Sequence, residues 1–134
     1  MRADATTTAE IEALVLATYN AMSTPGTDMA PFFGAADIGI VGSGQGEIWL
    51  GPEQAVGAAQ VVSSWGLRWT PHQITVWSRG DVAWAQILGA VHVVREGIDE
   101  HVPYTTTGVF TRGGGAQWRW AYWGGSEPQE DAKV

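Results

Sequence analysis

Cysteine is absent from this chain of 134 residues, which excludes both a disulfide framework and thiolate catalysis. Basic residues are scarce as well. Seven Lys and Arg stand against fourteen Asp and Glu, for a net charge of -7 at pH 7. So few scattered cations cannot neutralise a row of phosphates, and we therefore expect neither nucleic acid nor a membrane surface as a partner.

Long hydrophobic runs are also missing, because Gln, His or Gly interrupts each apolar stretch before it reaches membrane-spanning length. The opening segment M-R-A-D-A-T-T-T lacks the apolar core of a secretion signal, so we expect a soluble, cytoplasmic protein. The chain length fits one domain with a single core, which we assign to residues 1–126. The charged segment 127–134 is predicted to be a disordered acidic tail.

Helical periodicity marks two segments near the start of the chain. Thr7 and Glu10 form a capping-box pattern, and apolar residues then recur at helical spacing, which predicts a helix over 8–22. A short helical turn carries the two phenylalanines at 32–33. Proline at a first helical position and an apolar stripe predict a second main helix over 52–65.

The remainder of the chain is predicted to be β-structure. A small hairpin is expected around the glycine-rich turn 42–46, and the later strands are predicted at 67–77, 82–95, 98–112 and 116–123. Helices followed by a long antiparallel meander are typical of an α+β domain. We therefore predict a cone-shaped, curved antiparallel sheet that wraps around the N-terminal helices, with both main helices on its concave side.

The predicted hairpin 82–112 is the most informative segment, because polar residues interrupt a run that is too apolar for a surface strand. A two-residue turn at 96–97 places Gln86 and His92 on one sheet face and leaves small aliphatic side chains on the other. We interpret the polar face as the wall of a cavity. The aliphatic face should be covered in a homodimer. A bulge at Pro103 would shift the pairing beyond it.

Candidate site residues follow from this face. Ligand binding is assigned to apolar and hydroxyl side chains that point into the same space: Tyr19, Trp84, Leu88, Thr105, Thr107 and Trp120. Catalysis is assigned to side chains that donate, accept or titrate: Tyr122, Gln86, His92 and His101. The two histidines have no third ligand at a recognisable spacing, so we expect no metal site.

Each assignment has a structural alternative. Gln86 and Thr107 either hold a ligand oxygen or bond only to each other, and the two opposed histidines either transfer protons or form a solvated pair. Tyr122 reaches the cavity if the turn at 113–116 has four residues and faces away if it has three. Glu47, beside a tryptophan, places a carboxylate either at the cavity mouth or on an exposed hairpin.

Four sequence patterns resemble the SnoaL-like branch of the nuclear transport factor 2-like superfamily, and the resemblance spans residues 8–126. The patterns are F32-F-G-A-A-D37, the G-x-G-x-x-E-x-W-x-G segment at 42–51, G80-D-V-A-W84 and the closing stretch from T107 to S126. The resemblance implies a cystatin-like roll, a small hydrophobic ligand and no cofactor. It implies either a cofactor-independent cyclase, dehydratase or isomerase of polyketide type, or a non-catalytic binding or dimerisation module.

Two departures from the family narrow that implication. Tyr122 and Gly124 stand where related domains often carry histidines. Thr107 and Val41 stand where ketosteroid isomerase carries its acid and its base. The resemblance therefore disfavours an isomerase of that mechanism.

Overall fold

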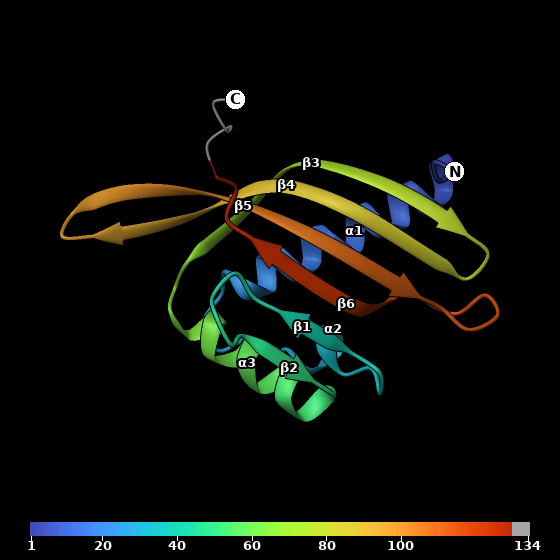
Figure 1. The fold of residues 1–134 in the computed structure, drawn as a ribbon, viewed down its shortest axis with the longest axis horizontal. Coiled ribbons are helices and arrows are strands. Elements are labelled where there is room, and N and C mark those ends of the chain that lie inside the picture. Colours follow the sequence, from blue (N-terminus) through green and yellow to red (C-terminus); the bar gives the residue numbers. More distant parts are fainter. Residues whose placement is uncertain (130–134) are drawn as a thin grey trace.

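The computed structural model describes residues 1–129 as three helices and six strands (Figure 1). The helices are α1 (Ala5–Met22), α2 (Ala30–Phe33) and α3 (Pro52–Ser64). The strands are β1 (Gly39–Val41), β2 (Ile48–Leu50), β3 (Arg68–Arg79), β4 (Val82–Arg95), β5 (Ile98–Thr111) and β6 (Arg119–Ser126).

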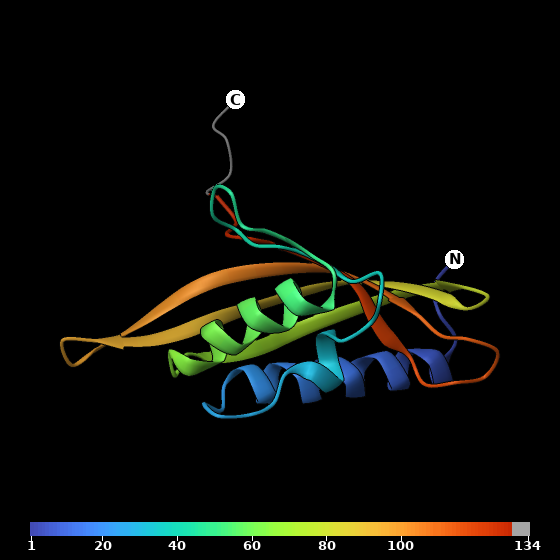
Figure 2. The same cartoon turned by 90° about the horizontal axis from the view of Figure 1, so that it is seen from below.

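All described strands join one sheet in the order β2-β1-β6-β5-β4-β3. The strands after residue 66 are antiparallel, as predicted, while β1 runs parallel to β6, a pairing that the sequence did not indicate. The sheet is curved, and α1 and α3 both lie on one side of it (Figure 2). The predicted α+β roll with its helices on the concave side is therefore confirmed.

Helix α1 starts three residues earlier than the periodicity indicated. Asp4 is its N-cap, and the carboxylate accepts the backbone N–H of Thr7 at 2.7 Å, in place of the predicted capping box. The core-facing stripe of the helix includes Ile11, Val15 and Tyr19, all of them buried. This stripe lies on the concave side of the sheet, where α1 contacts β3.

The β4–β5 hairpin confirms the predicted turn and its register. Glu96 and Gly97 have φ angles of 51° and 77°, and Arg95 pairs with Ile98 across them. Pairing then continues without a shift from Val82 to Thr111, so Pro103 introduces no bulge. The tip of the hairpin, residues 93–100, lies past the last pairing of β4 with β3 and extends beyond the rest of the molecule as an arm (Figures 1 and 2).

The assignment of the two faces of β4 was wrong. Ala83, Ala85, Ile87 and Val91 face the helices and are buried in the core, so this aliphatic surface is not left for a partner subunit. The polar face that includes Gln86 is the convex, outer side of the sheet.

The last strand also departs from its predicted register. The pairing of β5 with β6 shifts between Val109 and Phe110, which leaves Ala121 as an extra residue. Trp120 therefore faces the core and is fully buried, whereas Tyr122 faces outward and is 37% exposed. The predicted single row of these two side chains does not exist.

No helix within residues 1–129 is long and apolar enough to cross a membrane. Residues 130–134, the greater part of the predicted acidic tail, lie outside the described residues.

Candidate functional site

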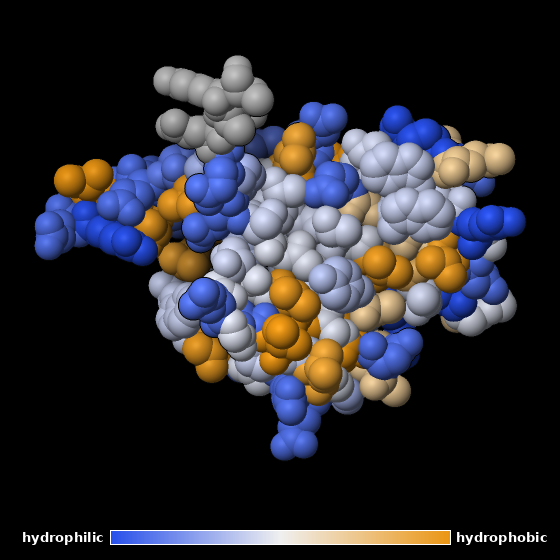
Figure 3. Space-filling view, in the orientation of Figure 1, coloured by the Kyte–Doolittle hydropathy of each residue, from blue (hydrophilic) through white to orange (hydrophobic). Residues whose placement is uncertain are grey.

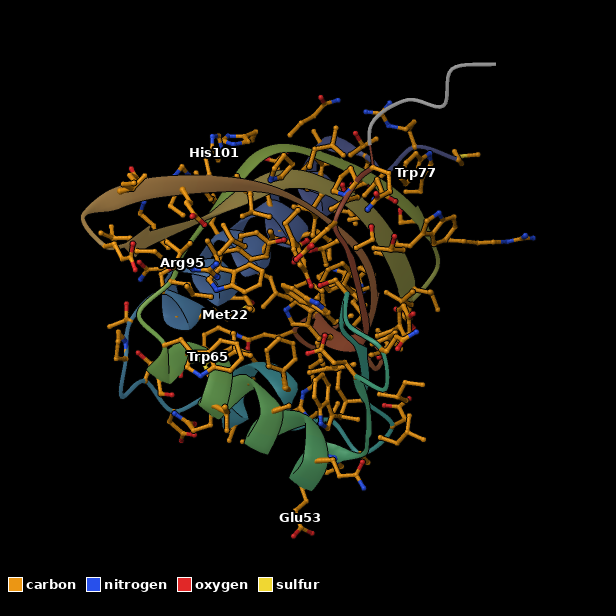
Figure 4. The ribbon with its side chains drawn as sticks, turned by 60° about the vertical axis from the view of Figure 1, so that its left-hand side comes forward. Met22, Glu53, Trp65, Trp77, Arg95 and His101 are labelled. Atoms are coloured by element: carbon orange, nitrogen blue, oxygen red, sulfur yellow. The ribbon has the colours of Figure 1, made fainter. Side chains whose placement is uncertain are left out.

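A cavity of about 220 Å³ opens between the β4–β5 arm, the C-terminal end of α3 and the β1–β2 hairpin. Met22 and Phe33 close it on the side of α1 and α2, and Val91 forms part of its sheet wall. Figure 4 shows Met22, Trp65 and Arg95 around the mouth of this space. The cavity lies on the concave side, opposite the face that the sequence analysis selected.

Aromatic rings form most of the deep wall. Trp69 on β3 packs edge-to-face against Tyr104 on β5, with ring centroids 4.9 Å apart, and against Trp123 on β6 at 6.1 Å. Trp123 also packs against Phe33 at 5.9 Å. Such interlocked rings present a preformed apolar surface to a ligand.

The polar end of the cavity is built by the turn between β1 and β2. The Glu47 carboxylate accepts the backbone N–H of Gly44, and a Cβ at position 42 would lie 3.0 Å from it. Glycine at 42 and 44 therefore leaves the space that the carboxylate occupies. Glu47 is half-buried and lines the cavity with Ser43.

Tyr104 brings a phenol to the same end of the cavity. Its ring is buried, and its hydroxyl lies against the backbone of Gly125, where a side chain would overlap it. Burial raises the pKa of Tyr104, the nearby carboxylates of Glu47 and Glu127 add to that rise, and hydrogen bonds to Trp123 and Ser43 oppose it. The phenol is therefore a neutral hydrogen-bond donor at pH 7.

The mouth carries two larger side chains on opposite sides. Trp65 caps the C-terminal end of α3 and is 62% exposed. Arg95 reaches the cavity from the arm, and its guanidinium lies 3.6 Å from the Glu100 carboxylate. Glu127, just beyond β6, completes the rim.

Two of the predicted ligand-binding residues lie in the core instead of the cavity. The Tyr19 hydroxyl and the Thr106 hydroxyl are 2.7 Å apart and both buried. Trp120 donates its indole N–H to the Thr18 hydroxyl at 2.9 Å. Neither side chain lines the cavity, and the polar atoms of both join α1 to the sheet.

The other predicted ligand-binding residues, and two of the catalytic ones, lie on the outer face. They are Trp84, Leu88, Thr105, Thr107, Gln86 and Tyr122. The Thr107 hydroxyl donates to the Gln86 amide oxygen at 3.1 Å, so these two side chains bond to each other. The prediction that this set shares one cavity with Tyr19 and Trp120 was wrong, because the sheet separates the two groups.

The two predicted catalytic histidines are neighbours, as the register required, but outside the cavity. The rings of His92 and His101 stack 4.4 Å apart with an angle of 13°, and His72 lies 6.2 Å from His101. Desolvation lowers the pKa of His92, with further contributions from Arg68 and His101. Within residues 1–129, no three His, Cys, Asp or Glu side chains are placed to hold a metal ion together.

The residues of the actual cavity were mostly missed. Tyr104 and Trp69 carry no local motif, and they meet Trp123 only through the pairing of four strands. Among the residues that the sequence analysis discussed, Glu47 came nearest to indicating this cavity, because a carboxylate beside Trp49 suggested a cavity mouth as one of its two alternatives. Glu47 is half-buried and lines the cavity, so it is not simply an exposed hairpin residue.

Comparisons with known proteins agree with this architecture. A model of the SnoaL-like domain matches residues 11–130, whereas no curated protein sequence matches the chain. A nuclear transport factor 2-like superfamily protein from Salmonella enterica serovar Typhimurium superimposes with a TM-score of 0.79 at 15% identity, covering 97% of this chain and 96% of that one.

Two further solved structures carry functional names. A candidate dehydratase of the nuclear transport factor 2-like family from Streptomyces avermitilis has a TM-score of 0.74 at 15% identity and covers 89% of this chain and 94% of that one. A candidate ketosteroid isomerase from Shewanella frigidimarina has a TM-score of 0.71 at 16% identity and covers 87% and 94%. These identities establish the shared fold alone. The domain match over nearly the whole described chain shows that this protein belongs to the SnoaL-like domain family.

Proposed function

We propose that this protein binds a small hydrophobic molecule in the cavity and transfers a proton on it without a cofactor, as an isomerase, a dehydratase or a cyclase would. The observation that carries this proposal is a carboxylate and a neutral phenol at one end of a cavity whose other walls are mostly aliphatic and aromatic. Glu47 and Tyr104 supply these two groups. The names of the two similar structures, a candidate dehydratase and a candidate isomerase, are compatible with such chemistry.

The two groups suit the two halves of an enolisation. Glu47 removes a proton from the carbon beside a ligand carbonyl, the electron pair of that C–H bond forms a C=C bond to the carbonyl carbon, and the C=O π pair moves onto the carbonyl oxygen. The Tyr104 O–H donates a hydrogen bond to the developing oxyanion. Glu47 then returns the proton to carbon, so that the reaction balances without an added reagent.

A suitable test uses phenylacetone, an enolisable aromatic ketone, in deuterated water. The protein should accelerate incorporation of deuterium next to the carbonyl, followed by nuclear magnetic resonance. Glu47→Gln should lower the rate by at least about 100-fold, because it removes the base. Tyr104→Phe should lower it by about 100-fold, because it removes one oxyanion donor. Gln86→Leu, on the outer face, is the matched control and should leave the rate unchanged.

A non-catalytic binding module is the second candidate, and one observation favours it. The Glu47 carboxylate already accepts the Gly44 backbone N–H, so one of its oxygens is used to hold the turn. Tight binding of hydrophobic probes with no deuterium exchange above the rate in buffer would identify a binding module and overturn the catalytic proposal.

A further inference from the structure

We propose that the molecule taken by this cavity is a cation: a small hydrophobic compound that carries a protonated or quaternary amine. The inference rests on the proposed function, because it concerns the ligand of the same cavity. Three features of the walls carry it, namely the indole rings, the balance of charges and the direction of α3.

The indole rings are the first feature. Trp49, Trp65 and Trp69 line the cavity on three different elements or their flanks, so that a ligand is enclosed by tryptophan from several sides. Tryptophan is the strongest of the aromatic side chains in attracting a cation to its ring face. Trp65 is 62% exposed at the mouth, where its ring is free to cover a bound molecule.

The charge balance of the lining is negative. Glu47 and Glu127 line the cavity, and neither forms an ion pair among residues 1–129. Arg95 is the one basic side chain of the lining in the described chain, and its guanidinium already faces the Glu100 carboxylate at 3.6 Å. A ligand cation would offset the two remaining carboxylates, whereas a ligand anion would be repelled by them.

The orientation of α3 adds partial negative charge at the cavity mouth. The helix begins at Pro52 and ends at the cavity mouth, where Trp65 is its C-cap, and its last turn contains no basic residue. The backbone carbonyls at a helix C-terminus carry a partial negative charge, which favours a nearby cation. No side chain of that turn supplies one.

The experiment compares two probes of nearly identical shape. Benzyltrimethylammonium and neopentylbenzene differ by the exchange of a cationic nitrogen for carbon, and phenylacetate serves as the anionic probe. Binding is followed by tryptophan fluorescence and by titration calorimetry. We expect the ammonium to bind at least about tenfold more tightly than its neutral isostere, and phenylacetate to bind more weakly than both.

Three variants assign the effect to the lining. Glu127→Gln should weaken ammonium binding by about threefold. Glu47→Gln, which retains an oxygen to accept the Gly44 N–H, should weaken it by about tenfold. Neither change should alter the affinity for neopentylbenzene. Glu53→Gln is the control, because it removes the same charge from the first turn of α3, where the side chain points away from the cavity (Figure 4).

The outcomes separate the two proposals. If neopentylbenzene binds as tightly as the ammonium, or if Glu53→Gln weakens binding as much as the lining variants, the cation inference is overturned while the hydrophobic cavity stands. If none of the three probes binds, both the inference and the proposed function fail.

Discussion

Gly125→Ala is the sharpest single perturbation of the site, because the Tyr104 hydroxyl occupies the space that a side chain at position 125 would take. An added Cβ would lie 2.6 Å from Tyr104 Cζ and 3.0 Å from Cε1. Carbon atoms in contact normally lie about 3.5–4.0 Å apart, so the ring must move by roughly 1 Å. Trp69 packs against the same ring, so this movement disturbs the deep wall of the cavity.

The cost follows from two contributions. Overpacking of a buried position costs about 1–3 kcal/mol, and loss of a hydrogen bond of the Tyr104 hydroxyl adds about 0.5–1.5 kcal/mol. We therefore expect the free energy of unfolding to fall by about 2–4 kcal/mol and the melting temperature to fall by roughly 10 °C. Thermal unfolding followed by circular dichroism measures the change, and fluorescence titration with neopentylbenzene measures the accompanying loss of ligand affinity.

Two comparisons make this prediction specific. Gly113→Ala adds the same methyl group in open space and should change stability by less than about 0.5 kcal/mol. In a Tyr104→Phe background the nearest overlapping atom is gone, so Gly125→Ala should cost less than it does in the original chain. If Gly125→Ala melts and binds like the original protein, the placement of the phenol against Gly125 is refuted.

Three further predictions concern the core and the outer face. Tyr19→Phe deprives the buried Thr106 hydroxyl of its partner at 2.7 Å and should lower the free energy of unfolding by about 1–2 kcal/mol in a denaturant titration, and an unchanged midpoint would contradict this. Burial raises the pKa of Tyr19 and of Tyr104 above the ordinary 10.0, so the stability from the neutral phenols is fully present below pH 10 and is lost as the pH rises further. In a Tyr122→Phe background, which leaves Tyr19 and Tyr104 as the two tyrosines of the chain, the circular dichroism signal should therefore be lost together with the rise in tyrosinate absorbance. Titration of these two phenols near pH 10 with the fold intact would refute the assignment. Hydrophilic residues gather mostly at the arm and around the edges of the face seen in Figure 3, while weakly polar and apolar residues cover most of its middle. Because Leu88 is 43% exposed on this outer face, we expect a homodimer there. Light scattering should give about twice 14.3 kDa for the original chain and about 14.3 kDa for Leu88→Asp.

Local sequence patterns were sufficient to predict the helices, the strands and the register of one strand pair. The Glu96–Gly97 turn fixes the pairing of β4 with β5 because a two-residue hairpin allows a single alignment of the flanking strands. The helices were predicted from their apolar stripes. The start of α1 was predicted three residues too late, because Asp4 caps the helix one turn before the predicted cap, Thr7. These features depend on residues that are close in sequence.

The orientation of β4 could not be settled by the same means. Alternation separates two faces but does not say which of them is covered when both are largely apolar, and here Trp84 lies on the outer face while Ala83 and Ala85 lie on the inner one. The extra residue Ala121 then places Trp120 and Tyr122 on opposite faces of the sheet, and no sequence pattern predicts this bulge. Both errors come from tertiary context.

The polar end of the cavity depends on glycines, whose missing side chains leave room for the polar groups. Gly42 and Gly44 leave the space that the Glu47 carboxylate occupies, and Gly125 leaves the space that the Tyr104 hydroxyl occupies. Gly42 and Gly44 act on Glu47 within one turn and belong to the G-x-G-x-x-E-x-W-x-G segment of the sequence. Gly125 acts on a residue of another strand, so its role is invisible until β5 and β6 are paired. A search for acids and bases along one strand therefore selects the wrong face. A search for glycines that cluster where strands end would have led to the polar end of the cavity, because a chain gives up a side chain where another group must lie against its backbone.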